Sequence, residues 1–239
     1  MVSAYLQPIV DAHRAEAAED QRPTDTLIEQ ARGLPPCRGF RDALASVEGL
    51  GVIAEIKRRS PSKGDLAIEL DPATVASAYA DGGATCLSVL TDGPHFGGST
   101  DDLALARAAV GLPVLRKDFT VAPNDVVDAR LMGADAVLLI VAALDDVELA
   151  DFATLAAELG LDVLVEVHDE AELERAVGGG ATVIGVNQRD LATFEVDTER
   201  AVRLAPAIPP SVLRVAESGV QGPADADELF RAGFQAVLV

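Results

Sequence analysis

Charged side chains stand at the ends of several short apolar runs, where they could share one site. Glu55 and Lys57 end the first run, Lys117 ends the third, and Glu166 lies inside the fifth. Burying one such charge alone would cost several kcal/mol, so we expect these groups to pair with one another. Lysines and carboxylates at one mouth are the groups that proton transfer and charge stabilisation need.

A basic segment follows the first apolar run. Residues 57–63 contain Lys57, Arg58, Arg59 and Lys63, in a chain whose net charge is 19 − 39 = −20. Such a segment can be an ordinary solvated loop or a site for an anion. In so acidic a chain, the concentration of positive charge after a strand favours the anion site.

The runs that carry these residues have the length and composition of buried strands. They are β-branched or leucine-rich and apolar on both faces, as expected for parallel strands covered by helices. Alanine-rich segments with helical periodicity separate them. The predicted strands are 51–57, 84–90, 113–117, 135–141, 162–167, 182–187, 212–217 and 235–239. The predicted helices between them are 72–81, 103–110, 124–132, 145–159, 170–177, 197–205 and 224–232.

The spacing of the strands predicts the fold class. Successive strand ends are 21 to 33 residues apart, which is one strand and one helix per unit. Eight such units favour a closed α/β barrel, the (β/α)₈ or TIM barrel, whose active site lies at the C-terminal ends of the strands. An open doubly wound sheet remains an alternative, because strand order cannot be read from the sequence.

The first 50 residues precede the barrel pattern. Helical periodicity over 3–20 and 24–32 predicts an N-terminal helical extension that covers the lower or side face, with a loosely docked tail as the alternative. We expect residues 1–239 to form one domain. The sequence stops at Val239, within the eighth strand, so the helix that would complete the eighth unit lies outside it.

Composition excludes several classes of partner. A strongly acidic surface repels nucleic acid and anionic membranes. No apolar run reaches the roughly 18–20 residues of a membrane span, and the N-terminus lacks the pattern of an export signal. Two cysteines, Cys37 and Cys86, are too few for a disulfide framework, and a reduced cytoplasmic setting fits best.

The charged strand ends carry a resemblance to a known family. The chain resembles indole-3-glycerol-phosphate synthase over roughly residues 36–239. The segments at 53–64 and 96–99 are highly specific, whereas the Glu-Ser-Gly at 217–219 alone would be weak. The matching segments are IAEIKRRSPSKG at 53–64, LSVLTD at 87–92, FGGS at 96–99, PVLRKDF at 113–119, LLI at 138–140, LVEVH at 164–168, IGVNQRDL at 184–191 and AESGV at 216–220.

The resemblance implies a reaction in tryptophan biosynthesis. The substrate is 1-(2-carboxyphenylamino)-1-deoxyribulose 5-phosphate, and the enzyme, a carboxy-lyase, closes an indole ring with loss of carbon dioxide and water. The family needs neither a metal nor an organic cofactor. A phosphorylated small molecule is the expected ligand, and we expect a monomer or weak homodimer.

The resemblance also implies roles for particular residues. Lys117 matches the general acid that protonates the ketone, and Glu166 matches the carboxylate that transfers protons around dehydration. Lys57 holds the substrate and is a second candidate acid, and Glu55 fixes Lys57. The division of work between the two lysines stays open.

Other matching residues are expected to hold the substrate. Asn187 and Glu217 belong to the catalytic residues and position the substrate. Phe96 and Phe119 flank its aromatic ring. Ser60 and Gly219 bind phosphate through backbone N–H groups, Ser218 joins them as a substrate-binding residue, and Arg189 contacts the carboxylate.

Two alternatives come from other functional classes. The first is another phosphosugar barrel, an isomerase of the histidine or tryptophan pathway, although those families use Asp/Asp or Cys/Asp pairs. The second is a non-catalytic barrel that binds a phosphorylated ligand. The chain departs from the family pattern at Gln188, where Asn or Ala is expected. It also departs at Val239, beyond which the family has a phosphate-binding turn and a last helix.

Overall fold

The computed structural model describes residues 6–61, 63–190 and 193–239. The expected helix start at residue 3, and positions 62 and 191 of the matching segments, lie outside these ranges. Eight parallel strands form a closed barrel in the order β1-β10-β9-β8-β7-β6-β5-β4. The closed order rules out the open doubly wound sheet.

The barrel strands fall within two residues of the predicted limits at each end. Each runs parallel to its neighbours, and β1 pairs with both β4 and β10 to close the ring. They are β1 (Gly51–Ile56), β4 (Cys86–Leu90), β5 (Val114–Lys117), β6 (Ala136–Ile140), β7 (Asp162–Val167), β8 (Val183–Asn187), β9 (Leu213–Glu217) and β10 (Ala236–Leu238).

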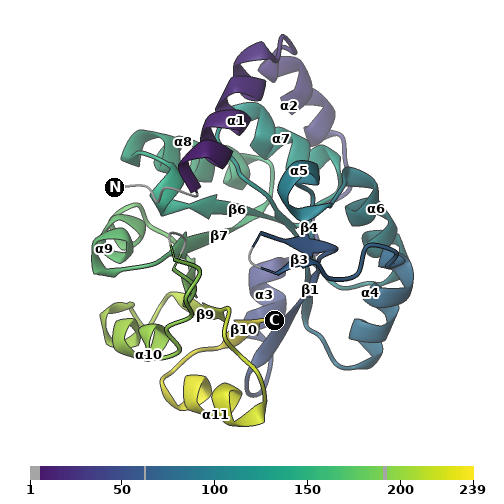
Figure 1. The fold of residues 1–239 in the computed structure, drawn as a ribbon. Coiled ribbons are helices and arrows are strands. Elements are labelled where there is room, and N and C mark those ends of the chain that lie inside the picture. The colour runs from purple at the N-terminus through teal and green to yellow at the C-terminus, as the bar shows by residue number, and fades with distance from the viewer. Residues whose placement is uncertain (1–5, 62, 191–192) are drawn as a thin grey trace.

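Helices surround the strands, as Figure 1 shows. Polar side chains cap several of them: Asp71 accepts from the backbone N–H of Thr74, and Ser99 from that of Asp102. The helices between barrel strands are α4 (Pro72–Asp81), α5 (Gly93–Phe96), α6 (Thr100–Ala109), α7 (Pro123–Leu131), α8 (Asp146–Glu158), α9 (Glu170–Gly178), α10 (Arg200–Leu204) and α11 (Pro223–Arg231).

Strand side chains alternate between two cores. Along β6, Val137 and Leu139 pack outward against the helices, and Ala136, Leu138 and Ile140 belong to the cluster that fills the barrel. This two-residue period is the geometry of a strand buried on both faces. The barrel interior is therefore a packed core.

The N-terminal helices contact three different parts of the barrel. Helix α2 (Thr24–Arg32) packs beside α7, and α3 (Phe40–Ala45) inserts Phe40 and Leu44 into the barrel interior. The prediction of a lower or side cover was wrong for α1 (Leu6–Glu19), because Leu6 and Ile9 line the cavity at the mouth. Periodicity identified an apolar helix face but not the surface that it covers.

Two short strands lie within the basic segment. β2 (Arg59–Ser60) and β3 (Gly64–Asp65) pair antiparallel and form a small hairpin after β1. This hairpin was not predicted, because two-residue strands are too short to show a period.

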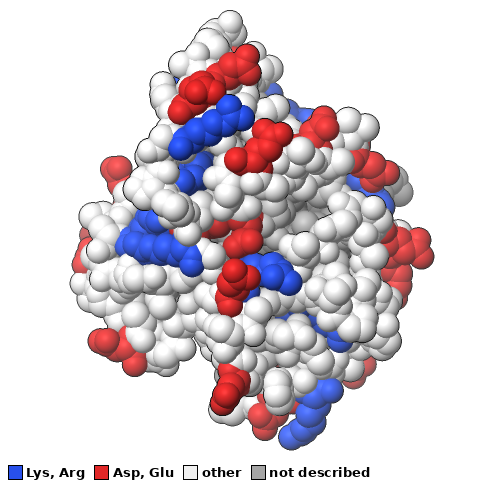
Figure 2. All heavy atoms as spheres, turned by 180° about the vertical axis from the view of Figure 1, so that it is seen from behind, with Lys and Arg blue, Asp and Glu red and all other residues white. Residues whose placement is uncertain are grey.

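The surface carries both signs of charge. On the face shown in Figure 2, most basic side chains lie beside acidic ones and do not gather into one basic surface. None of the described helices is long and apolar enough to cross a membrane.

Candidate active site

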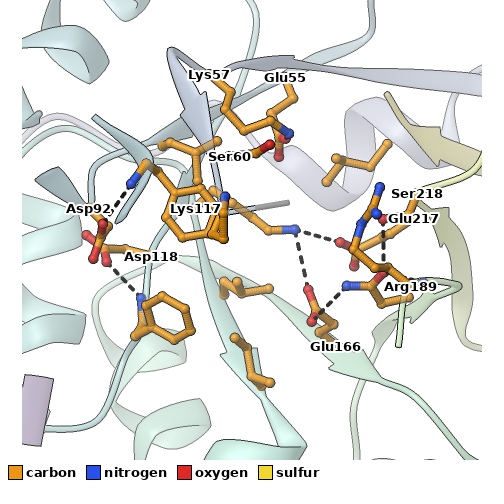
Figure 3. A pocket seen from close by; sticks show the side chains of 18 of the residues that line it. Glu55, Lys57, Ser60, Asp92, Lys117, Asp118, Glu166, Arg189, Glu217 and Ser218 are labelled. Carbon is orange, nitrogen blue, oxygen red and sulfur yellow. Dashed lines mark hydrogen bonds and ion pairs between the residues drawn. The ribbon is translucent and has the colours of Figure 1, made fainter. Parts of the chain in front are cut away.

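A cavity of about 310 Å³ opens at the C-terminal ends of the barrel strands. Figure 3 shows side chains from several strands pointing into it. Gly219 does not line it, although it directly follows Ser218, which does. Eleven predicted site residues line the cavity: Glu55, Lys57, Ser60, Phe96, Lys117, Phe119, Glu166, Asn187, Arg189, Glu217 and Ser218.

Lys117 lies between two carboxylates at the floor of the cavity (Figure 3). Its Nζ atom is 2.6 Å from Oε2 of Glu217 and 3.4 Å from Oε2 of Glu166. The side chains of Glu166 and Glu217 are only 3% and 1% exposed, so both carboxylates need a compensating positive charge, and this lysine supplies one. Three different strands, β5, β7 and β9, supply the group.

The two carboxylates have opposite pKa shifts. Burial raises the pKa of Glu166, but the charge of Lys117 and the contact with His168 overcome it, and the net shift is downward. Burial dominates at Glu217, and the charge of Glu166 adds to it, so the pKa of Glu217 rises to about 7. Two neighbouring carboxyl groups with separated pKa values can act as a base and an acid at one pH.

The charges around Lys117 keep it protonated. Burial pushes the pKa of Lys117 down, but Glu217, Glu166 and Glu55 together raise it above its usual value. The free protein therefore presents an ammonium group at the cavity floor throughout the physiological pH range.

A glycine makes room for Glu217. A Cβ atom on Gly185 of β8 would lie 2.0 Å from Oε1 of Glu217. Oε1 is buried and receives no hydrogen bond from any residue in the described ranges. Gly185 thus lets the carboxylate lie across β8 and reach Lys117.

Asn187 orients the opposite side of the group. Its Nδ2 donates to Oε1 of Glu166 at 3.2 Å. Its Oδ1 accepts from the backbone N–H of Arg189 and from Oγ of Ser218, each at 3.0 Å. The amide is fixed in one orientation, and it ties Glu166 to the loops after β8 and β9.

Glu55 and Lys57 form a second charged pair. Their side chains lie on one face of the chain and are joined by a short ion pair, and Oε2 of Glu55 accepts from Ser88 at 3.3 Å. Burial raises the pKa of Glu55, but the charges of Lys57 and Lys117 bring it below its ordinary value. The carboxylate therefore stays ionised and holds Lys57 beside the cavity.

The arginines of the basic segment are used within the protein. Arg58 forms a two-point ion pair with Asp102 of α6, at 2.8 and 3.0 Å, and Arg59 contacts Asp65 at 2.7 Å. Only Ser60, Pro61 and Lys63 of this loop line the cavity besides Lys57 among the described residues. The expected anion site is thus limited to a few residues, and the arginines anchor the loop.

One wall of the cavity is apolar. The rings of Phe96 and Phe119 are 6.4 Å apart and tilted by 43°, and Leu138 and Ile140 of β6 line the cavity near them. Sequence reasoning did not assign these two β6 residues to the site. The signal that could have identified them is their spacing of two residues along β6, which places both side chains on the barrel interior.

Helix α1 is fastened to the mouth beside this wall. Nε2 of His13 lies 3.0 Å from Oδ2 of Asp92 and 4.0 Å from Oδ1 of Asp118, and its ring packs against Phe119 at 5.1 Å. Arg14 forms two hydrogen bonds to Glu148 at 2.7 and 2.8 Å. Sequence reasoning missed these contacts, because nothing in a helical period identifies a partner so distant in the chain.

The His13, Asp92 and Asp118 cluster has ligand types that could suit a metal ion. Its oxygens are already engaged: Asp92 accepts from the backbone N–H of His95 and Phe96, and Asp118 accepts from Arg116. We therefore interpret the cluster as a structural contact that holds α1 on the barrel.

Solved structures of other enzymes share this fold. An N-acetylmannosamine-6-phosphate 2-epimerase from Clostridium perfringens is 12% identical with a TM-score of 0.64, covering 82% of this chain and 88% of that one. A thiamine phosphate pyrophosphorylase from Pyrococcus furiosus is 18% identical with a TM-score of 0.57, covering 80% and 85%. At these identities the likeness concerns the barrel alone.

Sequence comparison is far more specific. The family model described as indole-3-glycerol phosphate synthase matches residues 6–239. Curated proteins of that name from Parafrankia sp. and Mycolicibacterium smegmatis are both 50% identical to the chain. The alignments cover 98% and 99% of this chain and 88% of each relative. The phosphosugar isomerase alternative is thereby set aside, and the chain belongs to the indole-3-glycerol phosphate synthase family.

Proposed function

We propose that this chain converts 1-(2-carboxyphenylamino)-1-deoxyribulose 5-phosphate to indole-3-glycerol phosphate, with Lys117 as the central acid. The observation that carries the assignment is the position of Lys117, whose Nζ contacts Glu166 and Glu217 at the floor of a cavity with one apolar wall. The apolar wall suits the aromatic ring, and the charged floor suits the ketone.

Ring closure places negative charge on the ketone oxygen. The ring carbon that bears the carboxyl group attacks the ketone carbon, and Lys117 gives its proton to the oxygen as the bond forms. The carboxyl group then leaves as carbon dioxide, and its bonding electrons restore the aromatic ring. A positioned acid of this kind contributes about 10²–10⁴-fold to a rate.

Dehydration needs a base and an acid. Glu166, held ionised, takes a proton from the ring carbon beside the nitrogen. The electrons of that C–H bond form the ring double bond as the hydroxyl leaves with a proton from an ammonium group. Lys57 is our candidate for that second ammonium, because Glu55 holds it beside the cavity. Glu217, with a pKa of about 7 and 2.6 Å from Lys117, can return a proton to that lysine.

Substrate binding uses the remaining lining residues. Phe96 and Phe119 contact the aromatic ring on the apolar wall, and Arg189 pairs with the departing carboxylate. Ser60 and the turn at Ser218 and Gly219 donate hydrogen bonds to the phosphate. Both sides of this phosphate site lie at loops after strands, where barrels commonly bind phosphate.

The test compares the lysines of the chain, of which there are three: Lys57, Lys63 and Lys117. Lys117→Met removes the ammonium and keeps most of the side-chain volume, and we expect kcat to fall by at least about a hundredfold. Product formation is followed by the fluorescence of indole-3-glycerol phosphate.

Lys63→Met is the comparison variant, because Lys63 lines the cavity on the loop side but forms no ion pair with Glu166 or Glu217 in the described part of the chain, so its loss should raise KM and leave the chemical step in place. Its kcat should stay within about threefold of the unchanged protein. A folded Lys117→Met protein with kcat within tenfold of the unchanged protein would show that Lys117 is not the acid. Tight binding of the substrate without product by the unchanged protein would favour the non-catalytic alternative.

We further propose a cytoplasmic protein that is a monomer or weak homodimer. Both cysteines are free thiols, and burial raises the pKa of Cys86, which makes it unreactive. Sedimentation over a hundredfold range of concentration tests the oligomeric state, and a tight dimer at nanomolar concentration would contradict it.

A further inference from the structure

His168 lies directly behind Glu166 and has no part in the scheme above. It follows β7, and its side chain is 12% exposed. Nε2 is 3.3 Å from Oε1 of Glu166, and Nδ1 is 3.0 Å from Oε2 of Glu172 on α9. The ring does not line the cavity, so it reaches the substrate only through Glu166.

Glu172 fixes this histidine from the side away from the cavity. The same Oε2 atom that contacts Nδ1 also accepts the backbone N–H of His168, at 2.8 Å. Glu172 lies in the first turn of α9, where Asp169 caps the helix. The imidazole is therefore held between a carboxylate on a helix and a carboxylate at the end of a strand.

The ring is positively charged in this environment. Burial lowers the pKa of His168, but the contacts with Glu166 and Glu172 raise it to about 10. The charged groups that face the ring are Glu166 from β7 and Glu172 from α9, and Lys117 lies beyond Glu166. Across the physiological range the imidazole carries a proton on both nitrogens.

This second cation matters because Lys117 is shared. Lys117 contacts both Glu166 and Glu217, whereas Glu55 pairs with Lys57, so the single charge of Lys117 cannot compensate both of its carboxylate partners. A positive charge on the far side of Glu166 favours the ionised form of that carboxylate and leaves Glu217 as the group that takes up a proton. His168 faces Oε1 at ion-pair distance without hydrogen-bond geometry, and the same oxygen accepts from Nδ2 of Asn187.

We propose that His168 is a positioning residue, which, anchored by Glu172, keeps Glu166 ionised and oriented for proton transfer. The inference rests on the proposed role of Glu166. Removal of the imidazolium shifts the ionisation of Glu166 to higher pH, because one of its two cations is gone.

The experiment measures pH profiles of kcat and kcat/KM in His168→Leu, His168→Gln and Glu172→Gln. We expect kcat at neutral pH to fall at least about tenfold in His168→Leu, with KM changed little, as for a misplaced catalytic group. The acid limb of its profile should move to higher pH, so that part of the activity returns in alkaline buffer. His168→Gln keeps a donor without charge, so its acid limb should lie between those of the unchanged protein and His168→Leu. Glu172→Gln should also move the acid limb to higher pH.

Glu170→Gln is the matched control, because Glu170 is exposed in the same first turn of α9. The substitution removes the same negative charge as Glu172→Gln. It should leave the profile unchanged. Should His168→Leu fail to fold by circular dichroism, Glu172→Gln carries the test. A second readout is the NMR titration of the three histidines, in which His168 should stay protonated above pH 9.

The proposal is overturned if the acid limb stays in place in the folded variants, or if His168 titrates below pH 7. Glu166→Gln separates this failure from failure of the proposed function. Full activity in Glu166→Gln would remove the role of Glu166 itself. A large loss in Glu166→Gln with unmoved profiles in the His168 and Glu172 variants would remove only the positioning role.

Discussion

Buried charges occur at both ends of this barrel, and they are organised differently. At the lower end, Asp135 accepts the backbone N–H groups of Arg38 and Val114, at 2.8 and 2.9 Å, and forms an ion pair with Arg107. Asp162, which is half-buried, likewise accepts the backbone N–H of Arg41 at 2.9 Å. These carboxylates join the segment around α3 to the strands.

At the mouth, the buried charges face other titratable groups. Lys117, Glu166 and Glu217 contact one another beside an open cavity, and Oε1 of Glu217 has no hydrogen-bond partner within the described part of the chain. A buried carboxylate bound by backbone N–H groups therefore joins segments of the fold. One that faces a lysine and a second carboxylate has its proton affinity set by neighbours that a substrate can change.

The largest expected effect separates the two ends by stability. Asp135→Asn leaves Arg107 without its partner and places an amide where donors converge, so we expect unfolding free energy to fall by about 3–5 kcal/mol. Urea denaturation measures it. The protein that remains folded should keep its kcat, and a stable but inactive Asp135→Asn variant would contradict the division between the ends.

An intermediate effect is expected at Gly185. A Cβ atom there would meet Oε1 of Glu217 at 2.0 Å, so Gly185→Ala must displace the carboxylate from Lys117. We expect kcat to fall by about tenfold or more, as for a shift of about 1 Å in a catalytic group. Gly111→Ala is the control, because a Cβ atom at Gly111 meets no atom within 4 Å. Equal kcat values in the two variants would show that the position of Glu217 does not matter.

The smallest expected effect is the pH dependence of stability. The pKa of Glu217 is raised from 4.5 to about 7, so the folded protein binds a proton that the unfolded chain has released in this interval. The stability from this group is therefore present below pH 4.5 and is lost as pH rises through 7.

Urea denaturation between pH 4.5 and 8 in the unchanged protein and in Glu217→Gln measures this contribution. The unfolding free energy of the unchanged protein minus that of Glu217→Gln should decline as pH rises. A difference that is flat over this range would mean that Glu217 is ionised throughout. A parallel inflection near pH 7 in kcat/KM should disappear in the variant.

Much of the fold could be predicted because the strands are buried on both faces. The runs 135–141 and 162–167 are apolar except for Asp135, Asp162 and Glu166, and a capped helix separates them, so their limits differ from the structure by two residues at most. Helix α3 and the hairpin were not predicted. The six residues of α3 span less than two turns, and the two-residue strands of the hairpin show no period. The position of α1 depends on contacts such as His13 with Asp92, 79 residues apart, which no local pattern encodes.

The candidate site was predictable where charge interrupts an apolar strand. Lys117, Glu166 and Glu217 stand out for that reason, and the structure brings them together. Arg58 was conspicuous in the sequence, but it pairs with Asp102, because an arginine fork can fix a loop as well as bind a ligand. His168 was overlooked beside Glu166, although Glu172 four residues later was a signal of a helix-start contact.

The most direct test is a crystal structure with the product, indole-3-glycerol phosphate, bound in the cavity. We predict that the indole ring lies against the wall formed by Phe96 and Phe119, with the phosphate on Ser60 and the turn at Ser218 and Gly219. The former ketone carbon should lie over Lys117, within about 4 Å of Nζ, as a reacting centre requires. A product bound in the cavity with that carbon turned away from both Lys117 and Glu166 would contradict it.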